Sequence, residues 1–182
     1  MLQNLPVGDR RPGEKSPGEA IDMTVPGVFL EYAERHQDSP AQYSRTGEGF
    51  VPTTALEMAT RVARLARWLS ELGVDTSQRV CLMAATRPEW VLVDLAVTAL
   101  GAIVVPIYPT LPPESVRYIM QDSGARLAVL EHDAMRAGVP EGVPVLVMHG
   151  GEFGARLEHG PGDPAWLRKR LAAHPGRDHL AT

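Results

Sequence analysis

Short, almost wholly apolar segments alternate with helical segments through the middle of the chain, and this alternation restricts the fold more than any other feature. Each of the four segments lacks the polar alternate positions of a half-exposed strand, so each is predicted to be a strand buried on both faces of a sheet. They are RVCLMA (79–84), AIVVPI (102–107), RLAVL (126–130) and VPVLVM (143–148). Short helical connections between consecutive strands require right-handed crossovers. The sequence therefore predicts an α/β fold with a mostly parallel, layered sheet flanked by helices.

Helix signals surround these strands. Thr24 and Pro26 can begin a short helix, and Thr53 or Thr54 can cap a long helix that ends at Gly73. Further helices are expected at 87–100, 112–122, 132–137 (a short turn) and 164–173. Extended residues on both sides of Thr46-Gly47 predict a β-hairpin.

Glycine and proline set two further expectations. Residues 149–163, HGGEFGARLEHGPGD, are so rich in glycine that we expect a loop there and no helix. Pro106 lies inside the second apolar segment, where it cannot donate a ladder hydrogen bond, so strand pairing should end near it.

Composition limits the class of protein. The 182 residues are 44% hydrophobic and 22% charged with a net charge of -4, as in a soluble globular domain, and they give no reason to expect nucleic acid as a partner. The single cysteine, Cys81, excludes an internal disulfide and a cysteine zinc cluster, and it fits a reducing compartment. Residues 1–24 are rich in Pro, Gly and charge and are expected to be a flexible leader. These features predict a cytoplasmic protein and leave peripheral membrane contact and oligomeric state open.

Several motifs suggest a site but remain incomplete. His149-Gly150-Gly151 resembles a hydrolase oxyanion loop, but no serine occurs in G-x-S-x-G, so a surface loop is the better interpretation. Gly150, Gly151 and Gly154 match a dinucleotide fingerprint only in part, and neither lysine, Lys15 or Lys169, belongs to a P-loop. A zinc site at His174, Asp178 and His179 is weakly indicated at most.

Three further features have a functional and a structural interpretation. Arg61, Arg64 and Arg67 form a helical stripe that could bind anions, although a solvated helix face is the commoner cause. Trp90 could line a pocket, but packing of the helix against the sheet is favoured. Cys81 lies between apolar neighbours and is expected to be a core residue.

Residues 79–131 resemble the N-terminal part of the adenylate-forming (AMP-binding) superfamily, closest to the long-chain fatty acyl-CoA synthetase branch. Three motifs carry the resemblance, namely Arg87-Pro88-Glu89-Trp90, the stretch LGAIVVPIY (100–108), and Tyr108-Pro109-Thr110-Leu111. The sequence departs from the family at Phe50-Val51-Pro52-Thr53, where the threonine-tyrosine strand is expected. The resemblance extends from about Val28 to Thr182, so residues 25–182 are expected to be a partial AMP-binding N-terminal domain.

The resemblance implies an acid–thiol ligase that activates a fatty acid with ATP and Mg²⁺ as an acyl-adenylate and then transfers the acyl group to CoA. In the family, the phosphate-binding loop, the ribose carboxylate and the catalytic lysine all follow the position of Thr182. We therefore assign no catalytic, cofactor-binding or metal-binding residue to this chain, and we expect it to be inactive alone. The alternatives are a non-catalytic α/β binding or regulatory module derived from the family, and an aryl- or amino-acid adenylation domain.

Overall fold

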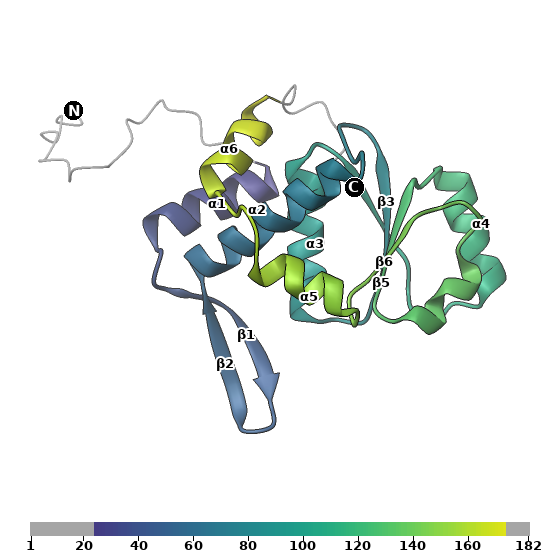
Figure 1. Ribbon diagram of the computed structural model, residues 1–182, viewed down its shortest axis with the longest axis horizontal. Helices are drawn as coiled ribbons and strands as arrows, with labels where there is room; N and C mark the ends of the chain where they lie inside the picture. The colour runs from purple at the N-terminus through teal and green to yellow at the C-terminus, as the bar shows by residue number, and fades with distance from the viewer. Residues whose placement is uncertain (1–23, 174–182) are drawn as a thin grey trace, which may run out of the picture.

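The computed structural model describes residues 24–173, which form a small sheet with helices on both faces and a protruding hairpin (Figure 1). The helices are α1 (Val25–Arg35), α2 (Ala55–Glu71), α3 (Pro88–Ala99), α4 (Pro113–Ser123), the 3-10 helix η1 (Asp133–Gly138), α5 (Gly151–Glu158) and α6 (Pro164–Ala172). The strands are β1 (Pro40–Thr46), β2 (Gly49–Thr54), β3 (Arg79–Met83), β4 (Ile103–Pro106), β5 (Leu127–Leu130) and β6 (Val145–Val147). Residues 1–23 of the expected leader (1–24) and the zinc candidate at His174, Asp178 and His179 lie outside the described residues.

The four predicted apolar strands form one parallel sheet in the order β4-β3-β5-β6. The α/β prediction is therefore confirmed, with strand ends that differ by one or two residues. After β3 the chain crosses to β4 on one side, and after β4 it crosses back to β5 on the other side of β3. Because of this reversal, β3 and β5 are neighbours, and the chain segments that follow the two strands run in opposite directions away from them.

Pro106 ends β4, as expected, and the position of this strand explains why proline is tolerated. β4 lies at one edge of the described sheet and pairs only with β3. The backbone N–H groups of Ile103 and Ile107 donate to Gln78 and Leu82 of the β3 side, so the alternate position 106 faces away from β3. Proline at an outward-facing edge position costs no ladder hydrogen bond.

The two faces of the sheet have different cores. Val80, Leu82, Val104, Leu127 and Val129 face the larger core, which also contains residues of α1, α2, α3, α5 and α6. The alternate strand positions face a smaller core, formed with α4 and residues beside η1. Figure 1 shows α4 on the opposite side of the sheet from the other helices. Side-chain alternation along buried strands places apolar residues on both faces.

The helix ends follow the predicted capping signals. Thr54 and Glu57 form a capping box at the start of α2, in which Glu57 N–H donates to the Thr54 hydroxyl at 3.2 Å and Thr54 N–H donates to Glu57 at 2.8 Å. Gly124 ends α4 in the left-handed conformation, with φ 67°. None of the helices in 24–173 is long and apolar enough to span a bilayer.

The expected loop at 149–163 is wrong over its first half, because Gly151–Glu158 forms α5. Phe153 and Leu157 lie one helical turn apart and are both buried, and the Phe153 ring contacts Trp68 of α2. Burial of two large apolar side chains on one helix face outweighs the low helix propensity of glycine. A helix therefore does begin directly after Gly150, contrary to the expectation from the glycine content.

The arginine stripe of α2 holds this added helix in place. Arg64 donates to the carbonyl oxygens of Leu157, at 2.8 Å, and Gly160, at 3.2 Å. Its guanidinium group therefore caps the carboxyl end of α5. Arg61 forms an ion pair with Glu158, and Arg67 lies over the Trp166 ring at 4.3 Å. The stripe is therefore neither a free anion site nor merely solvated, since it joins α2 to α5 and α6.

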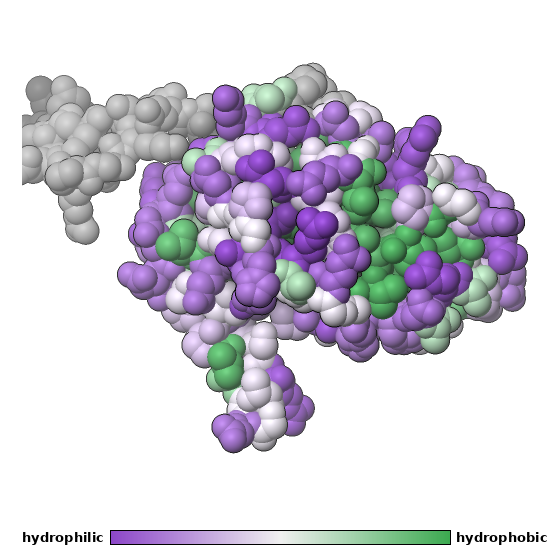
Figure 2. All heavy atoms as spheres, in the orientation of Figure 1, coloured by the Kyte–Doolittle hydropathy of each residue, from purple (hydrophilic) through white to green (hydrophobic). Residues whose placement is uncertain are grey.

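Apolar side chains reach the surface at several places, two of which are the sheet edge at β6 and the hairpin. Figure 2 shows apolar side chains gathered over the part of the sheet that carries β6, and all three residues of that strand are only half-buried. The hairpin β1–β2 extends from the body and exposes Tyr43, Phe50 and Val51. The Gln42 side chain donates to the Pro88 carbonyl at 3.1 Å and ties the base of the hairpin to α3.

Candidate functional site

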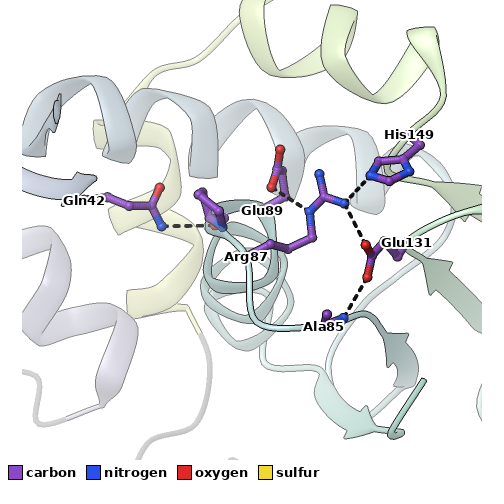
Figure 3. Close-up of polar contacts among 7 residues, drawn as sticks. Gln42, Ala85, Arg87, Glu89, Glu131 and His149 are labelled. Atoms are coloured by element: carbon purple, nitrogen blue, oxygen red, sulfur yellow. Dashed lines mark hydrogen bonds and ion pairs between the residues drawn. The ribbon is translucent and has the colours of Figure 1, made fainter. Parts of the chain in front are cut away.

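The carboxyl ends of β3, β5 and β6 bring charged side chains together where the strand connections diverge. In open parallel sheets, this switch point at the carboxyl ends of the strands is where ligands usually bind. Arg87 and Glu89 follow β3 and begin α3, Glu131 follows β5 directly, and His149 follows β6. The fold therefore gathers four polar side chains from three separate segments (Figure 3).

Arg87 is the centre of this group, which we call the Arg87 cluster (Arg87, Glu89, Glu131 and His149). Its Nε donates to Glu89 Oε2 at 2.8 Å, and its Nη1 lies 3.4 Å from Glu131 Oε1. The same Nη1 lies 2.5 Å from His149 Nε2. Since a guanidinium only donates, His149 accepts through Nε2 and carries its proton on Nδ1 in this arrangement. Figure 3 shows the guanidinium between the three partners.

Glu131 completes the connection between β5 and β3. One of its carboxylate oxygens faces Arg87, and the other accepts the backbone N–H of Ala85 at 2.8 Å. The loop that follows β3 is therefore held to the end of β5 by one charged and one backbone contact. Hydrogen bonds to an ionised group are the stronger kind in proteins.

The electrostatics of the cluster follow from partial burial and charge pairing. Burial alone would raise the pKa of Glu89, but the hydrogen bond and charge of Arg87 outweigh it, and the pKa of Glu89 is lowered. The hydrogen bond that Arg87 donates to Glu89 likewise raises the pKa of Arg87. Glu89 also lies in the first turn of α3, where a negative charge is favourable. Arg87 and Glu89 therefore stay charged together near neutral pH.

The Arg87 cluster satisfies itself, which limits the chemistry it can perform. The described contacts of Arg87 go to Glu89, Glu131 and His149, and neither carboxylate is left without a donor. Within residues 24–173, no three His, Cys, Asp or Glu side chains gather as a metal site. The residues at this edge therefore do not fit a Mg²⁺–nucleotide site by themselves. The cluster instead holds together the three loops that follow β3, β5 and β6.

The other sequence candidates lie away from this edge or have structural roles. Cys81 is fully buried, and burial raises the pKa of its thiol to about 12, so it is a core residue as expected. Trp90 packs against the larger core, which agrees with the packing interpretation. Lys169 lies in α6, and the other lysine, Lys15, is outside the described residues.

The sequence interpretation missed the joint role of Arg87, Glu131 and His149. Arg87 and Glu89 had been noted only as part of a family motif, and His149 only as the start of a glycine-rich loop. A usable signal was present, because each of these residues follows a predicted strand and the carboxyl ends of parallel strands share one edge.

Comparison with known proteins identifies the family. Residues 29–182 match the AMP-binding enzyme family. Long-chain-fatty-acid–CoA ligase FadD15 of Mycobacterium bovis is 39% identical over 159 residues, which cover 77% of this chain and 26% of that protein. The chain thus spans about a quarter of the length of this relative. Surfactin synthase subunit 1 of Bacillus subtilis is 38% identical over 106 residues, or 58% of this chain and 3% of that protein.

Solved structures share the fold. VinN superposes with a TM-score of 0.66 at 19% identity, over 87% of this chain and 40% of its own. The N-terminal subdomain of Klebsiella oxytoca NpsA, in complex with 3-hydroxybenzoyl-AMSN, superposes with a TM-score of 0.65 at 21% identity, over 83% of this chain and 35% of its own. The family match covers most of the residues that form the sheet and its helices, and the chain belongs to the AMP-binding enzyme family.

Proposed function

We propose that this chain serves as the N-terminal part of a long-chain-fatty-acid–CoA ligase. The observation that carries the proposal is the 39% identity to FadD15, which extends over 77% of this chain. The match to surfactin synthase covers only 58% of the chain. The longer match, together with Tyr108-Pro109-Thr110, favours a fatty acid over an amino acid as the substrate of the whole enzyme.

The proposed role of these residues is to support a site and not to perform the reaction. The whole enzyme would activate a fatty acid with ATP and then form a thioester with CoA. In the described part, Arg87 fixes the loops at the carboxyl ends of β3, β5 and β6, where a substrate or the rest of the enzyme would make contact. A preorganised rim of this kind keeps neighbouring binding groups at the correct positions.

The proposal predicts that the 182-residue chain makes no acyl-CoA alone. Palmitate, ATP, Mg²⁺ and CoA would be incubated with the purified chain, and palmitoyl-CoA and pyrophosphate would be measured against a reaction without protein. The expected result is no product above that background, because the charged groups at the carboxyl ends of the strands are already paired with one another. Isothermal titration should likewise show no tight ATP binding.

Acyl-CoA formation by the purified chain would contradict the supporting role. FadD15 assayed in parallel is the positive control for the reagents. A chain that is folded by circular dichroism, binds a different ligand and never supports ligation in any larger context would instead favour a non-catalytic binding module.

A further inference from the structure

The amino ends of β3 and β5 carry two arginines whose side chains have no polar partner among residues 24–173. Arg79 begins β3, Arg126 precedes β5, and the backbone N–H of Arg126 donates to the Arg79 carbonyl at 2.9 Å, so the two residues are neighbours. Both are exposed. Neither side chain forms an ion pair or hydrogen bond with any residue of 24–173. Two positive charges side by side on adjacent strands repel each other.

This arrangement is unusual within the molecule. Ten other arginines of the described part bind a carboxylate, a carbonyl oxygen or an aromatic ring, and Arg45 at the hairpin is the remaining exception. Arg45 stands alone on the hairpin, whereas Arg79 and Arg126 lie together. Their mutual repulsion would be relieved by an anion, which makes this end of the sheet a candidate for an anionic ligand.

A cavity of about 570 Å³ is lined in part by Arg126, while Arg79 lies outside the lining. Arg126 is the only charged residue in its lining, and no acidic residue lines it. Its walls combine the apolar side chains of Leu72, Val74, Met120 and Val143 with the polar side chains of Gln78 and Gln121. Ligand pockets of proteins usually have volumes of about 300–1,000 Å³ and combine apolar walls with a few polar groups. The size and lining therefore suit a small ligand with an apolar body.

Three glycines keep this cavity open. Gly73, Gly124 and Gly142 all line it, with φ values of 86°, 67° and 82°. Glycine adopts these left-handed conformations without strain, and a Cβ at any of the three would meet no atom within 4 Å. The three turns therefore reach the cavity without side chains that would fill it.

We propose that this groove, at the opposite end of the sheet from the Arg87 cluster, binds an amphipathic carboxylate. Arg126, with Arg79 beside it, would receive the carboxylate, and the apolar walls would receive the alkyl chain. Guanidinium groups bind carboxylates with two parallel hydrogen bonds, which a lysine could not provide. The assignment does not depend on ligase activity, because it rests on residues outside the carboxyl edge.

Octanoate titrated into the ¹⁵N-labelled 182-residue chain tests this proposal. Saturable shifts are expected at the amides of Gly73, Gly124 and Gly142, whose residues surround the cavity. Arg126→Gln should weaken octanoate binding about tenfold, as loss of a charged hydrogen bond of about 1.5 kcal/mol or more requires. Arg79→Gln should weaken it less, about threefold. Arg126→Lys should recover part of the affinity.

Three controls separate this site from general association. Arg45→Gln removes the other arginine of residues 24–173 that has no polar partner there, and it should leave octanoate affinity unchanged. Octanol lacks the charge, and inorganic phosphate lacks the alkyl chain, so each should bind at least several times more weakly than octanoate. The proposal would be overturned by shifts that avoid the three glycines, by equal binding to Arg126→Gln, or by phosphate binding as tight as octanoate binding. Unaltered melting temperatures of the variants exclude a loss of fold as the cause.

Discussion

The two ends of the parallel sheet use arginine in opposite ways. At the carboxyl end, Arg87 contacts two carboxylates and an imidazole, and every charge in the cluster has a partner. At the amino end, Arg79 and Arg126 are neighbours, and neither side chain forms an ion pair or hydrogen bond within residues 24–173. The difference arises from position, since Glu89 and Glu131 follow strands, while no acidic residue lines the groove beside Arg126. Paired arginines hold loops in place, whereas unpaired ones leave charge available to a ligand.

The largest effect is expected from Arg87→Gln. Only about a fifth of the Arg87 side chain is exposed, and its loss leaves two partly buried carboxylates without their cation. We expect the free energy of unfolding to fall by about 2 kcal/mol. Urea denaturation followed by circular dichroism measures it.

Arg136→Gln is the matched control, because within residues 24–173 Arg136 pairs only with the exposed Asp133 on η1. It should cost less than about 0.5 kcal/mol. Equal stabilities of Arg87→Gln and the wild-type chain would show that the Arg87 cluster does not fasten the loops.

An effect of intermediate size is expected when the stabilities of the wild-type chain and Arg87→Gln are compared over a range of pH. The pKa of Glu89 lies below its ordinary value of 4.5 in the folded chain, so its contribution is present above that value and is lost as pH falls through the folded pKa. Without Arg87, burial would dominate and raise the pKa of Glu89, which reverses the sign of its contribution. The stability difference between wild type and Arg87→Gln should therefore shrink between pH 6 and pH 3. A difference that stays constant over this range would contradict the pairing.

The smallest effects are expected at the amino end. Arg79→Gln and Arg126→Gln remove charges that repel each other and have no polar partner in the described part of the chain. Each should therefore change the free energy of unfolding by less than about 0.5 kcal/mol, in the stabilising direction. The same urea experiment measures both. A loss comparable to that of Arg87→Gln at either position would reveal a structural role and remove the contrast between the two ends.

Much of the fold could be predicted from the sequence, because buried strands and capped helices leave local signals. The four apolar segments and the Thr54 cap can each be recognised from a few consecutive residues. The α5 helix could not be predicted, because its glycines indicate a loop and only Phe153 and Leu157 favour a helix. The burial of this pair depends on packing against α2, where the Phe153 ring contacts Trp68, far away in the sequence.

The Arg87 cluster could not be predicted in the same way, because it depends on strand order. Arg87 and His149 are 62 positions apart and meet only because β5 and β6 lie beside β3 in the order observed. Apolar periodicity identifies strands but does not order them. The arginine stripe of α2 shows the same limit, since its spacing predicts one helix face while its partners come from 157–166.

The most direct test of the proposed ligase role is a chimera. Residues 24–173 of this chain would replace the matching segment of FadD15, and palmitoyl-CoA formation would be measured beside intact FadD15. A segment that supports the ligase site should give an active chimera, and Arg87→Gln within it should lower activity more than Arg136→Gln. A chimera that folds, binds ATP and forms no palmitoyl-CoA would contradict the role proposed for this chain.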